Sequence, residues 1–365
     1  MHISIKREDL LKPLTTVAGV VERRQTLPIL SNILLRHNGK ELVLTGTDLE
    51  VEISTRTDST GSSGEITVPA RKLYDICKAL PNEAKIDITL EKEKVLIKSG
   101  KSRFRLLTMP ASGFPAIETA QWDTSLTLSQ KNLRWLLEKT MFCMAQQDVR
   151  YYLNGLLLEA HAQRLRGVAT DGHRLSLADV DISSSVDVEK QAIVPRKGVQ
   201  EMARFLDDSD TDIQLQFGAN HLRCTQKDLT FTSKLIDGRF PDYNRVIPVK
   251  QDKKILVQRS MFRETLNRAA ILSNEKYRGV RFGLSRDQMT ITAHNPEQEE
   301  AQEEIAITYA GEDLEIGFNV SYISEAVAAI DSEQVEFCLS DQSSSCLLRA
   351  PGSQKYLYVV MPMRL

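Results

Sequence analysis

The sequence lacks the features that mark secreted, membrane-spanning or nucleotide-hydrolysing proteins. Among its 365 residues, no apolar run approaches the ~20 residues that a membrane-spanning helix needs. The N-terminus has no apolar signal region, so we expect a cytoplasmic protein. The five cysteines are odd in number and form no CxxC pair, which predicts reduced, packed thiols. No GxSxG, GxxxxGK[ST] or GxGxxG motif occurs, so we expect neither a cofactor nor a bound metal.

The sequence also lacks a large net charge, because its formal net charge is only −2. A surface that is basic all over is therefore excluded, and the distribution of charge matters more than the total. Basic residues concentrate on predicted helices, for example Lys131 and Arg134, while acidic residues gather at 297–304. The basic helices either face a polyanion or are ordinary solvated faces.

The chain contains a pattern that occurs three times. Residues 67–81, 193–206 and 316–330 each contain a short β-type run that turns directly into an amphipathic helix. Phe114-Pro115 likewise recurs as Phe240-Pro241, roughly 125 residues later. A period of that length is too long for a solenoid repeat, so each copy is predicted to be a domain with its own core.

The fold class predicted from these copies is α+β, with three repeated domains. Each copy has two helices, and the first of them carries apolar residues at i, i+4 and i+7, as in Leu10, Leu14 and Val17. Alternating strands follow each helix, so we expect two helices packed on β-sheets in every domain. The predicted domains cover residues 1–120, 121–248 and 249–365.

A short segment separates residues that serve the fold from candidate functional residues. Residues 44–50 (LTGTDLE) recur as residues 168–175 (VATDGHRL), which places Asp48 and Asp171 at equivalent positions. Both are predicted to close turns by accepting hydrogen bonds from nearby amides, as is Asn295 in the third copy. Three residues belong to the middle copy alone and are better functional candidates: Tyr152, His173 and Arg174.

An enzymatic alternative rests on Asp171 and His173, two residues apart, as a hydrolytic dyad or metal pair. No second carboxylate or cysteine lies nearby at ligand spacing, and the aspartate recurs in the first copy at Asp48. We therefore expect a turn at this position, and no catalytic residue. A scaffold that binds only other proteins is the other alternative.

Taken together, the motifs resemble those of the bacterial DNA polymerase III β subunits, the sliding clamps. The resemblance runs from one end of the chain to the other, and several motifs of seven or more residues occur in order. The motifs are TLPILSN (26–32), LTGTDLE (44–50), QDVRYYLNG (147–155), ATDGHRL (169–175), GRFPDY (238–243), NPEQEEA (295–301) and YVVMPMRL (358–365).

The resemblance implies a non-catalytic DNA replication protein. Two chains would associate head to tail into a ring, each chain forming half of it, with helices toward duplex DNA and sheets outside. The ring would tether the replicative polymerase and other replication and repair proteins, and so confer processivity. An ATP-driven clamp loader would open it, and the partners would bind through short linear peptides.

The resemblance also places a subunit interface on two charged segments. In residues 101–107, basic and apolar side chains alternate along a predicted strand, whereas residues 297–304 are acidic. These edges would pair across subunits; the alternative is two unrelated charged edges. The residues that the resemblance assigns to the interface are Lys72, Arg103, Phe104, Leu106, Ile271, Leu272, Glu299, Glu300 and Glu303.

For DNA, the resemblance assigns contacts to Arg24, Gln147, Tyr151 and Tyr152. Contacts of the ring should reach phosphates and be independent of sequence. The tyrosines could stack on bases of a single-stranded tail. The alternative is that at least one of the two tyrosines packs in the core.

The sharpest expectation is a groove for short peptides near the apolar C-terminus, where leucine and methionine side chains would give an adaptable floor. The alternative is a core between domains. Ser343 departs from the family pattern, which has an apolar residue there, so peptide preference could differ. The groove residues are Leu153, Thr170, Gly172, His173, Arg174, Leu175, Pro241, Arg245, Val246, Asn319, Tyr322, Val359, Val360, Met361, Pro362, Met363 and Arg364.

Overall fold

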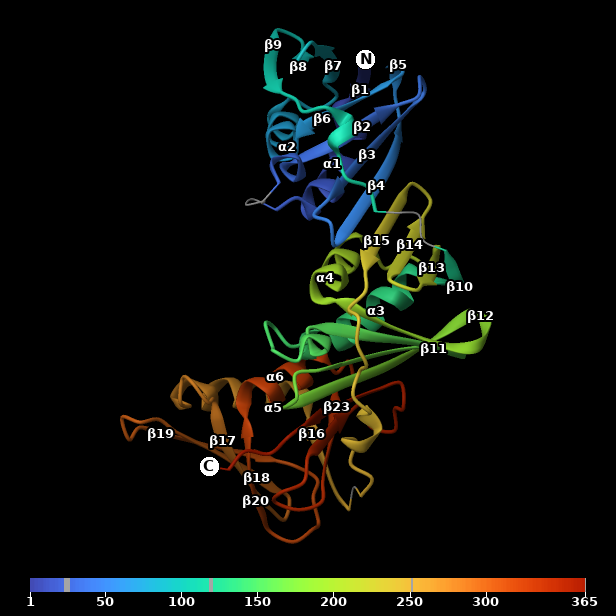
Figure 1. Ribbon diagram of the computed structural model, residues 1–365. Helices are drawn as coiled ribbons and strands as arrows, with labels where there is room; N and C mark the ends of the chain where they lie inside the picture. Colours follow the sequence, from blue (N-terminus) through green and yellow to red (C-terminus); the bar gives the residue numbers. More distant parts are fainter. Residues whose placement is uncertain (23–26, 118–120, 251, 365) are drawn as a thin grey trace. The chain divides into compact units, whose positions relative to one another are not determined.

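Figure 1 shows the computed structural model of the chain, which describes residues 1–22, 27–117, 121–250 and 252–364. Contacts within the chain group it into two compact units. Unit 1 comprises Met1–Lys131, Ile182–Val186 and Lys197–Ile236, and unit 2 comprises Asn132–Asp181, Asp187–Arg196 and Asp237–Leu365.

Unit 1 contains two antiparallel sheets. Their strand orders are β5-β1-β7-β8-β9 and β10-β13-β14-β15-β4-β3-β2-β6. Helix α1 packs on β3, β4 and α2 (Figure 1). The elements are β1 (His2–Lys6), α1 (Arg7–Val20), η1 (Pro28–Ser31), β2 (Asn32–His37), β3 (Glu41–Thr47), β4 (Val51–Asp58), β5 (Thr60–Ser62), β6 (Gly64–Pro69), α2 (Ala70–Ala79), β7 (Lys85–Glu91), β8 (Lys94–Ser99), β9 (Ser102–Leu107), η2 (Ala111–Gly113), β10 (Trp122–Ser129), most of α4 (Arg196–Phe205), β13 (Asp212–Gly218), β14 (His221–Gln226) and β15 (Leu229–Lys234).

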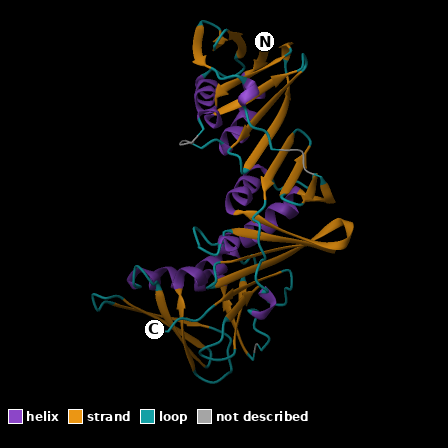
Figure 2. Cartoon of the chain, viewed as in Figure 1, coloured by secondary structure: helices purple, strands orange, loops and turns teal. Residues whose placement is uncertain are grey.

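Unit 2 contains two further sheets, with strand orders β11-β12-β23-β22-β21-β16 and β19-β18-β17-β20. Helix α5 packs on β18, β19 and α6 (Figure 2). The elements are most of α3 (Gln130–Thr140), η3 (Met141–Cys143), η4 (Tyr151–Leu153), β11 (Gly155–Thr170), β12 (Arg174–Pro195), η5 (Tyr243–Arg245), β16 (Lys253–Gln258), α5 (Arg259–Ala269), η6 (Ala270–Leu272), β17 (Gly279–Ser285), β18 (Gln288–His294), β19 (Glu300–Ala306), β20 (Leu314–Asn319), α6 (Val320–Ala329), β21 (Gln334–Leu339), β22 (Cys346–Arg349) and β23 (Tyr356–Val360).

The threefold repeat is visible in how the helices are held. At the start of α1, the Arg7 N–H donates to the Ala84 carbonyl at 2.8 Å, beyond the end of α2. The same bond recurs from Gln130, at the start of α3, to Thr211 at 2.9 Å, beyond the end of α4. It recurs again from Arg259, at the start of α5, to Glu333 at 2.8 Å, beyond the end of α6. The predicted apolar stripe of the first helix is buried, with Leu10, Leu14 and Val17 fully covered. The α+β prediction and the two helices of each copy are therefore confirmed.

The cores are apolar, and the cysteines belong to them. In the third copy, the rings of Phe262, Phe282, Phe318 and Phe337 pack mostly edge to face, with centroids 5.5–6.3 Å apart. All five cysteines are buried free thiols, as predicted, and burial raises the pKa of Cys143 to about 12.

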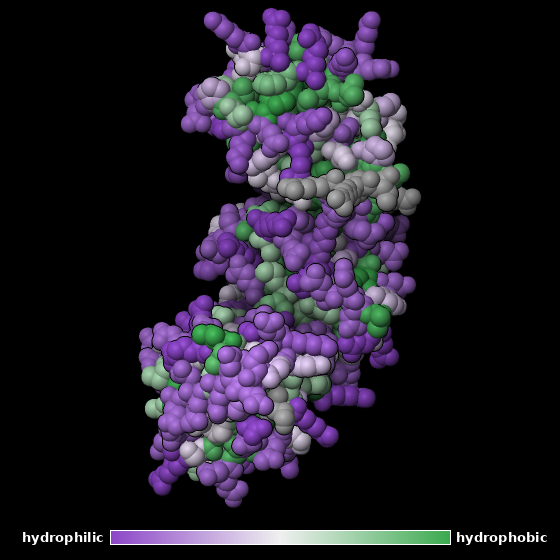
Figure 3. Space-filling model, turned by 90° about the vertical axis from the view of Figure 1, so that its left-hand side faces the viewer, coloured by the Kyte–Doolittle hydropathy of each residue, from purple (hydrophilic) through white to green (hydrophobic). Residues whose placement is uncertain are grey.

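The face shown in Figure 3 is mostly hydrophilic, and hydrophobic residues gather on it only in a few patches. Within the described ranges, no helix is both long and apolar enough to cross a bilayer.

Candidate functional site

The site is built around a tight turn between β11 and β12. The Thr170 hydroxyl donates to the Arg174 carbonyl at 2.6 Å and accepts from the Gly172 N–H at 3.1 Å. The Asp171 carboxylate accepts from the N–H groups of His173 and Arg174, at 2.9 and 3.1 Å. These local bonds confirm that Asp171 closes a turn, and they fix the direction in which the next side chains leave it.

The end of the chain lies beside this turn. Strand β23 pairs with β12 so that Val360 lies opposite Arg174 and Val359 opposite Leu175. The Met361 N–H then donates to the His173 carbonyl at 2.9 Å. Two segments that are far apart in the sequence therefore form one wall, because antiparallel pairing fixes their register.

A cavity of about 230 Å³ opens in this wall and is called the Gly172 groove below. Most of its lining is apolar, with a few polar groups at the margin, which suits an apolar side chain of a ligand. Its lining residues are Arg150, Tyr152, Leu153, Thr170, Gly172, Arg174, Leu175, Pro241, Asp242, Tyr243, Val246, Val359 and Met361.

Nine of the seventeen predicted groove residues line this cavity, and eight do not. Val360 is buried in β23, and Arg245 is exposed and paired with Asp242 at 3.0 Å. The Asn319 side chain accepts from the N–H groups of Ser321 and Tyr322, at the start of α6. The predicted residues that do not line the cavity are His173, Arg245, Asn319, Tyr322, Val360, Pro362, Met363 and Arg364.

Three lining residues were not predicted as part of the groove at all: Arg150, Asp242 and Tyr243. Tyr152 also lines it, although the sequence assigned this residue to DNA. The sequence contained one indication that Tyr243 belongs to the groove, because this residue lies two positions after the repeated Phe-Pro pair.

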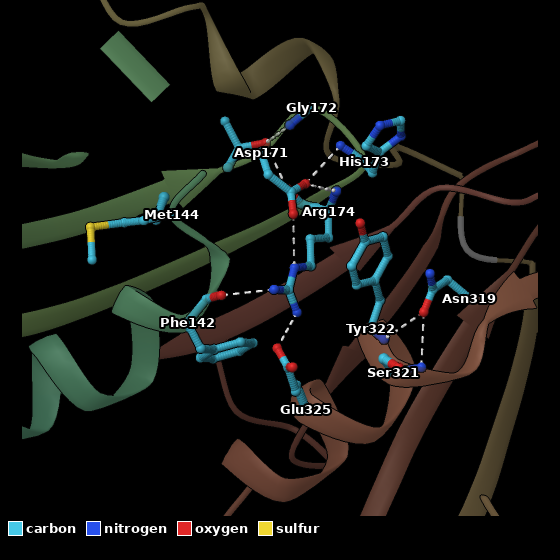
Figure 4. A network of polar contacts seen from close by, with 12 residues as sticks. Phe142, Met144, Asp171, Gly172, His173, Arg174, Asn319, Ser321, Tyr322 and Glu325 are labelled. Atoms are coloured by element: carbon cyan, nitrogen blue, oxygen red, sulfur yellow. Dashed lines mark hydrogen bonds and ion pairs between the residues drawn. The ribbon is translucent and has the colours of Figure 1, made fainter. Parts of the chain in front are cut away.

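Arg174 connects the turn to helix α6 (Figure 4). Its guanidinium donates to Asp171 at 3.1 Å and to the Phe142 carbonyl at 2.8 Å, and it also pairs with Glu325 of α6. The guanidinium lies 4.4 Å from the ring centroid of Tyr322, a cation–π distance. Because each of its three nitrogens donates to a partner, Arg174 holds the turn and α6 together.

A second, polar hollow of about 510 Å³ shares Arg174 with the Gly172 groove. His173 and Tyr322 line it, and their rings stack with centroids 6.4 Å apart. Burial raises the pKa of the Tyr322 hydroxyl. His173 and Tyr322 therefore border the polar hollow rather than the apolar groove.

The loop before η4 is held by its own side chains. The Asn154 amide donates to the Asp148 carbonyl and accepts from its N–H, both at 2.9 Å. The Asp148 carboxylate accepts from the Arg150 backbone and guanidinium at 2.8 to 3.0 Å, which lowers the pKa of this carboxyl to about 2. Arg150 also donates to the Asp171 carbonyl at 3.1 Å. This loop is therefore fixed against the turn.

The contact of the Arg150 guanidinium with the turn requires a glycine at position 172. Its φ is +89°, in the left-handed region that favours glycine. A Cβ at this position would lie 2.8 Å from both terminal nitrogens of Arg150. Any other residue would have to displace the guanidinium from the rim of the groove.

Tyr243 forms another part of the lining, and hydrogen bonds to its hydroxyl hold the side chain in place. Its hydroxyl donates to the buried Glu159 carboxylate at 3.2 Å and accepts from Arg166 at 3.2 Å. Arg166 in turn forms a bidentate pair with Asp179 at 2.7 and 2.8 Å. Burial raises the pKa of Tyr243, so the hydroxyl stays protonated and the ring is a neutral wall.

Ser343 does not act as a free hydroxyl. Its Oγ donates to the Asp341 carboxylate at 2.8 Å, and Ser344 donates to the same group at 2.7 Å. Ser343 does not line the Gly172 groove, so the lining gives no support for a change in peptide preference at this residue.

The candidate DNA residues are partly described. Arg24 lies outside the described residues. Gln147 is exposed and has a φ of +57°, while Tyr151 is 57% exposed. Tyr152 is half-buried and meets Tyr151 edge to face, with centroids 5.8 Å apart. Neither tyrosine is buried, so the alternative that one packs in the core does not hold.

The two candidate interface strands are edge strands of their own sheets. Strand β9 ends one sheet of unit 1, with Arg103 exposed and both Phe104 and Leu106 half-buried, as the predicted alternation requires. Lys72, on α2, is exposed. An edge strand leaves a row of backbone groups available for another chain.

Strand β19 ends one sheet of unit 2. Nearby, Ile271 is 76% exposed and Leu272 is half-buried. All three of the candidate acidic residues have partners within the chain: Glu303 pairs with Arg268 at 2.7 Å, Glu299 accepts from Asn295, and Glu300 lies 3.9 Å from the His294 ring. Glu300 is exposed.

The geometry disfavours the enzymatic alternative at the turn. One oxygen of Asp171 accepts from two backbone amides and the other accepts from Arg174, so the carboxylate does not orient His173. Within the described part of the chain, no three His, Cys, Asp or Glu side chains form a group that could hold a metal ion.

Comparison with known proteins gives matches along the whole chain. Three family descriptions match: the DNA polymerase III beta subunit N-terminal domain at residues 1–118, the central domain at 127–242 and the C-terminal domain at 244–364. A curated beta sliding clamp of Pseudomonas putida is 54% identical over 367 residues and covers 100% of both chains.

Solved structures agree with these matches over 100% of each chain. A crystal structure of the DNA polymerase III subunit beta from Pseudomonas aeruginosa has a TM-score of 0.98 at 53% identity. Another sliding clamp from the same organism, bound to griselimycin, has a TM-score of 0.97 at 54% identity.

Proposed function

The chain belongs to the DNA polymerase III beta subunit family, the beta sliding clamps, and from this premise we propose that it is a replicative DNA clamp. It acts as a non-catalytic processivity factor: it tethers the DNA polymerase to duplex DNA by enclosure. The observation that carries the proposal is the full-length match to beta sliding clamps at 54% identity, with all three domains of the family in order.

The proposed assembly is a head-to-tail homodimer that closes into a ring. The free edges of β9 and β19, one basic and apolar and the other acidic, support this proposal, because opposite charges on two strand edges favour pairing between chains. The exposed Ile271 supplies apolar area beside the acidic edge. Domain boundaries near residues 120 and 248 and a cytoplasmic location are part of the same proposal.

The proposed contact with DNA is sequence-independent. The exposed Gln147 and Tyr151 support it, because they project from a loop that Asp148 and Asn154 fix in place. Gln147 would reach phosphates, and Tyr151 would stack on a base of a single-stranded tail. Arg24 is proposed as a phosphate contact on the strength of the family resemblance.

The proposed partner site is the Gly172 groove, which would take an apolar side chain of a short linear peptide from a polymerase subunit or clamp loader. Its volume of about 230 Å³ and its apolar lining support this use. The fixed positions of Arg150, Arg174 and Tyr243 lower the entropic cost of binding, since the walls are ordered before the peptide arrives.

One experiment tests the clamp directly. The protein is loaded by its ATP-driven loader onto nicked circular DNA, isolated by gel filtration, and the DNA is then cut once. Enclosure predicts that the protein stays on the circle in high salt and leaves after linearisation. Equal retention on circular and linear DNA would show that the protein binds DNA by surface contacts rather than by enclosure, and it would contradict the proposal.

The subunit interface is tested by replacing its exposed apolar residues. Ile271→Ala with Leu272→Ala should shift the protein to monomers in sedimentation at low concentration, because the replaced side chains supply the apolar area of the interface. Lys85→Ala is a surface control, because Lys85 is exposed and lies in β7, which β8 separates from the edge strand β9. An intact dimer in the double variant would place the interface elsewhere.

A further inference from the structure

Unit 1 contains a cavity of about 250 Å³, which is close in volume to the Gly172 groove of unit 2. This cavity is called the Leu49 pocket here. Its lining comes from the turn after β3, from the segment after η2 and from β14 and β15. The lining residues are Thr47, Leu49, Pro115, Ala116, Ile117, His221 and Lys234.

The turn beneath this pocket repeats the turn of the Gly172 groove bond for bond. The Thr47 hydroxyl donates to the Val51 carbonyl at 2.9 Å and accepts from the Leu49 N–H at 3.0 Å. The Asp48 carboxylate accepts from the N–H groups of Glu50 and Val51, at 2.9 and 2.7 Å. Thr47 and Leu49 therefore stand where Thr170 and Gly172 stand in the groove.

The remaining walls correspond as well. Pro115 belongs to the first Phe-Pro pair and Ile117 lies two residues after it, as Pro241 and Tyr243 do in the second pair. The Lys234 N–H donates to the Glu50 carbonyl at 2.8 Å, as the Met361 N–H does to His173. Six pairs of lining residues occupy equivalent positions in the two cavities. With the residue of the Leu49 pocket given before that of the Gly172 groove, they are Thr47 and Thr170, Leu49 and Gly172, Pro115 and Pro241, Ala116 and Asp242, Ile117 and Tyr243, and Lys234 and Met361.

The differences between the two cavities define the ligand. Lys234 replaces the thioether of Met361 with an ammonium group that is partly exposed and lies 3.9 Å from the exposed Glu50. His221 adds a second basic side chain to the lining. Leu49, Pro115 and Ile117 supply the apolar part, and the Ile117 N–H is held by Glu52 at 3.1 Å.

We propose that the Leu49 pocket is a second peptide-binding site, which takes a bulky apolar side chain followed by a carboxylate. The apolar residues accommodate the side chain, and the carboxylate replaces Glu50 beside Lys234. The Gly172 groove has the uncharged Met361 at that position, and its own positive charges lie elsewhere in the lining, at Arg150 and Arg174. The two sites therefore place a positive charge at different positions, and only the Leu49 pocket places one at the position of Lys234.

Methyl NMR of the full-length protein with labelled isoleucine and methionine separates the two sites. The Ile117 methyl reports the Leu49 pocket, and the Met361 methyl reports the Gly172 groove. The probes are acetyl-Leu-Phe-Asp-amide and the matched neutral peptide acetyl-Leu-Phe-Asn-amide, each titrated to about 5 mM, where weak binding is still detected.

The aspartate peptide should shift Ile117 in a saturable way, and the asparagine peptide should bind there about two- to fivefold more weakly, as expected for an exposed ion pair. Lys234→Gln should abolish that preference, whereas Val246→Glu, in the Gly172 groove, should leave the Ile117 titration unchanged. An Ile117 signal that does not move overturns the proposal whatever Met361 does. Equal binding of both peptides to Ile117 overturns the assigned charge preference.

Discussion

The turns at Asp48 and Asp171 have the same four hydrogen bonds and different surroundings. In the first copy, the second oxygen of Asp48 pairs with Lys197, and Leu49 occupies the left-handed position with a φ of +78°. In the second copy, Asp171 pairs with Arg174, and Gly172 occupies that position. The comparison shows that the turn itself belongs to the fold.

What distinguishes the second copy is the set of groups that the turn presents. The glycine leaves room for Arg150, whose guanidinium lies against it, and Arg174 reaches across to Glu325. In the first copy the half-buried Leu49 stands where Gly172 stands, and the buried Val51 stands where Arg174 stands. A small residue and an arginine therefore place two guanidinium groups, those of Arg150 and Arg174, in the lining of the Gly172 groove, whereas the Leu49 pocket contains neither.

The largest expected effect comes from giving the second turn the residue of the first. Gly172→Leu places a Cβ 2.8 Å from Arg150 at a φ of +89°, so the guanidinium must leave and the side chain enters the groove. We expect peptide affinity to fall at least about tenfold and the free energy of unfolding to fall by about 1–2 kcal/mol. Fluorescence anisotropy with a labelled partner peptide and urea unfolding measure the two effects. Unchanged affinity would contradict the role given to the glycine.

A smaller effect is expected from Arg174→Ala, which leaves Asp171, Glu325 and the Phe142 carbonyl without the shared donor. We expect a loss of about 1–3 kcal/mol in the free energy of unfolding, together with weaker peptide binding. Arg174→Lys should not restore binding, because one ammonium group cannot reach three partners in the geometry of a guanidinium. Full rescue by lysine would show that charge alone suffices.

The reciprocal change in the first turn should be nearly neutral. Leu49→Gly relieves about 1–2 kcal/mol of left-handed strain, but it removes a half-buried side chain and adds freedom to the unfolded chain. We expect the free energy of unfolding to change by less than about 1 kcal/mol in urea unfolding. A loss above that would mean that Leu49 packs as a core residue and that the two turns are less alike than their bonds indicate.

The smallest expected effect is that of pH on the loop that carries Arg150. The Arg150 hydrogen bonds lower the pKa of Asp148 from 3.8 to about 2. A lowered carboxyl pKa stabilises the folded loop above 3.8, and this contribution is lost as the pH falls through about 2. The Arg150 Nε–H signal in NMR should therefore stay unchanged between pH 7 and about 5. Movement within that range would show that Asp148 does not hold the arginine.

The sequence predicted the parts of the fold that depend on near neighbours. The apolar stripe of Leu10, Leu14 and Val17 requires only a helical period, and Asp48 and Asp171 bond to amides two and three residues away. The repeat added a control, because a residue shared by two copies was assigned to the fold. Those expectations are confirmed by the helices and turns.

The rest depends on contacts that no local pattern contains. Arg150 lines the groove because it packs on Gly172, and Tyr243 lines it because Glu159 holds its hydroxyl. Both contacts join segments that are distant in the sequence. The Ser343 hydroxyl was expected at the groove, but it bonds to Asp341, two residues away. The Asp341 carboxylate decides the direction of this hydroxyl.

The most direct test compares Asp48→Ala with Asp171→Ala in clamp-dependent DNA synthesis on primed circular DNA, at equal concentrations of folded, loaded protein. Each variant removes the acceptor of two backbone amides and one ion pair, so both should lose similar stability. Only Asp171→Ala should lose stimulation of the polymerase, because only that turn presents the groove. Equal loss in both variants, or no loss in Asp171→Ala, would contradict the assignment of partner binding to the second turn.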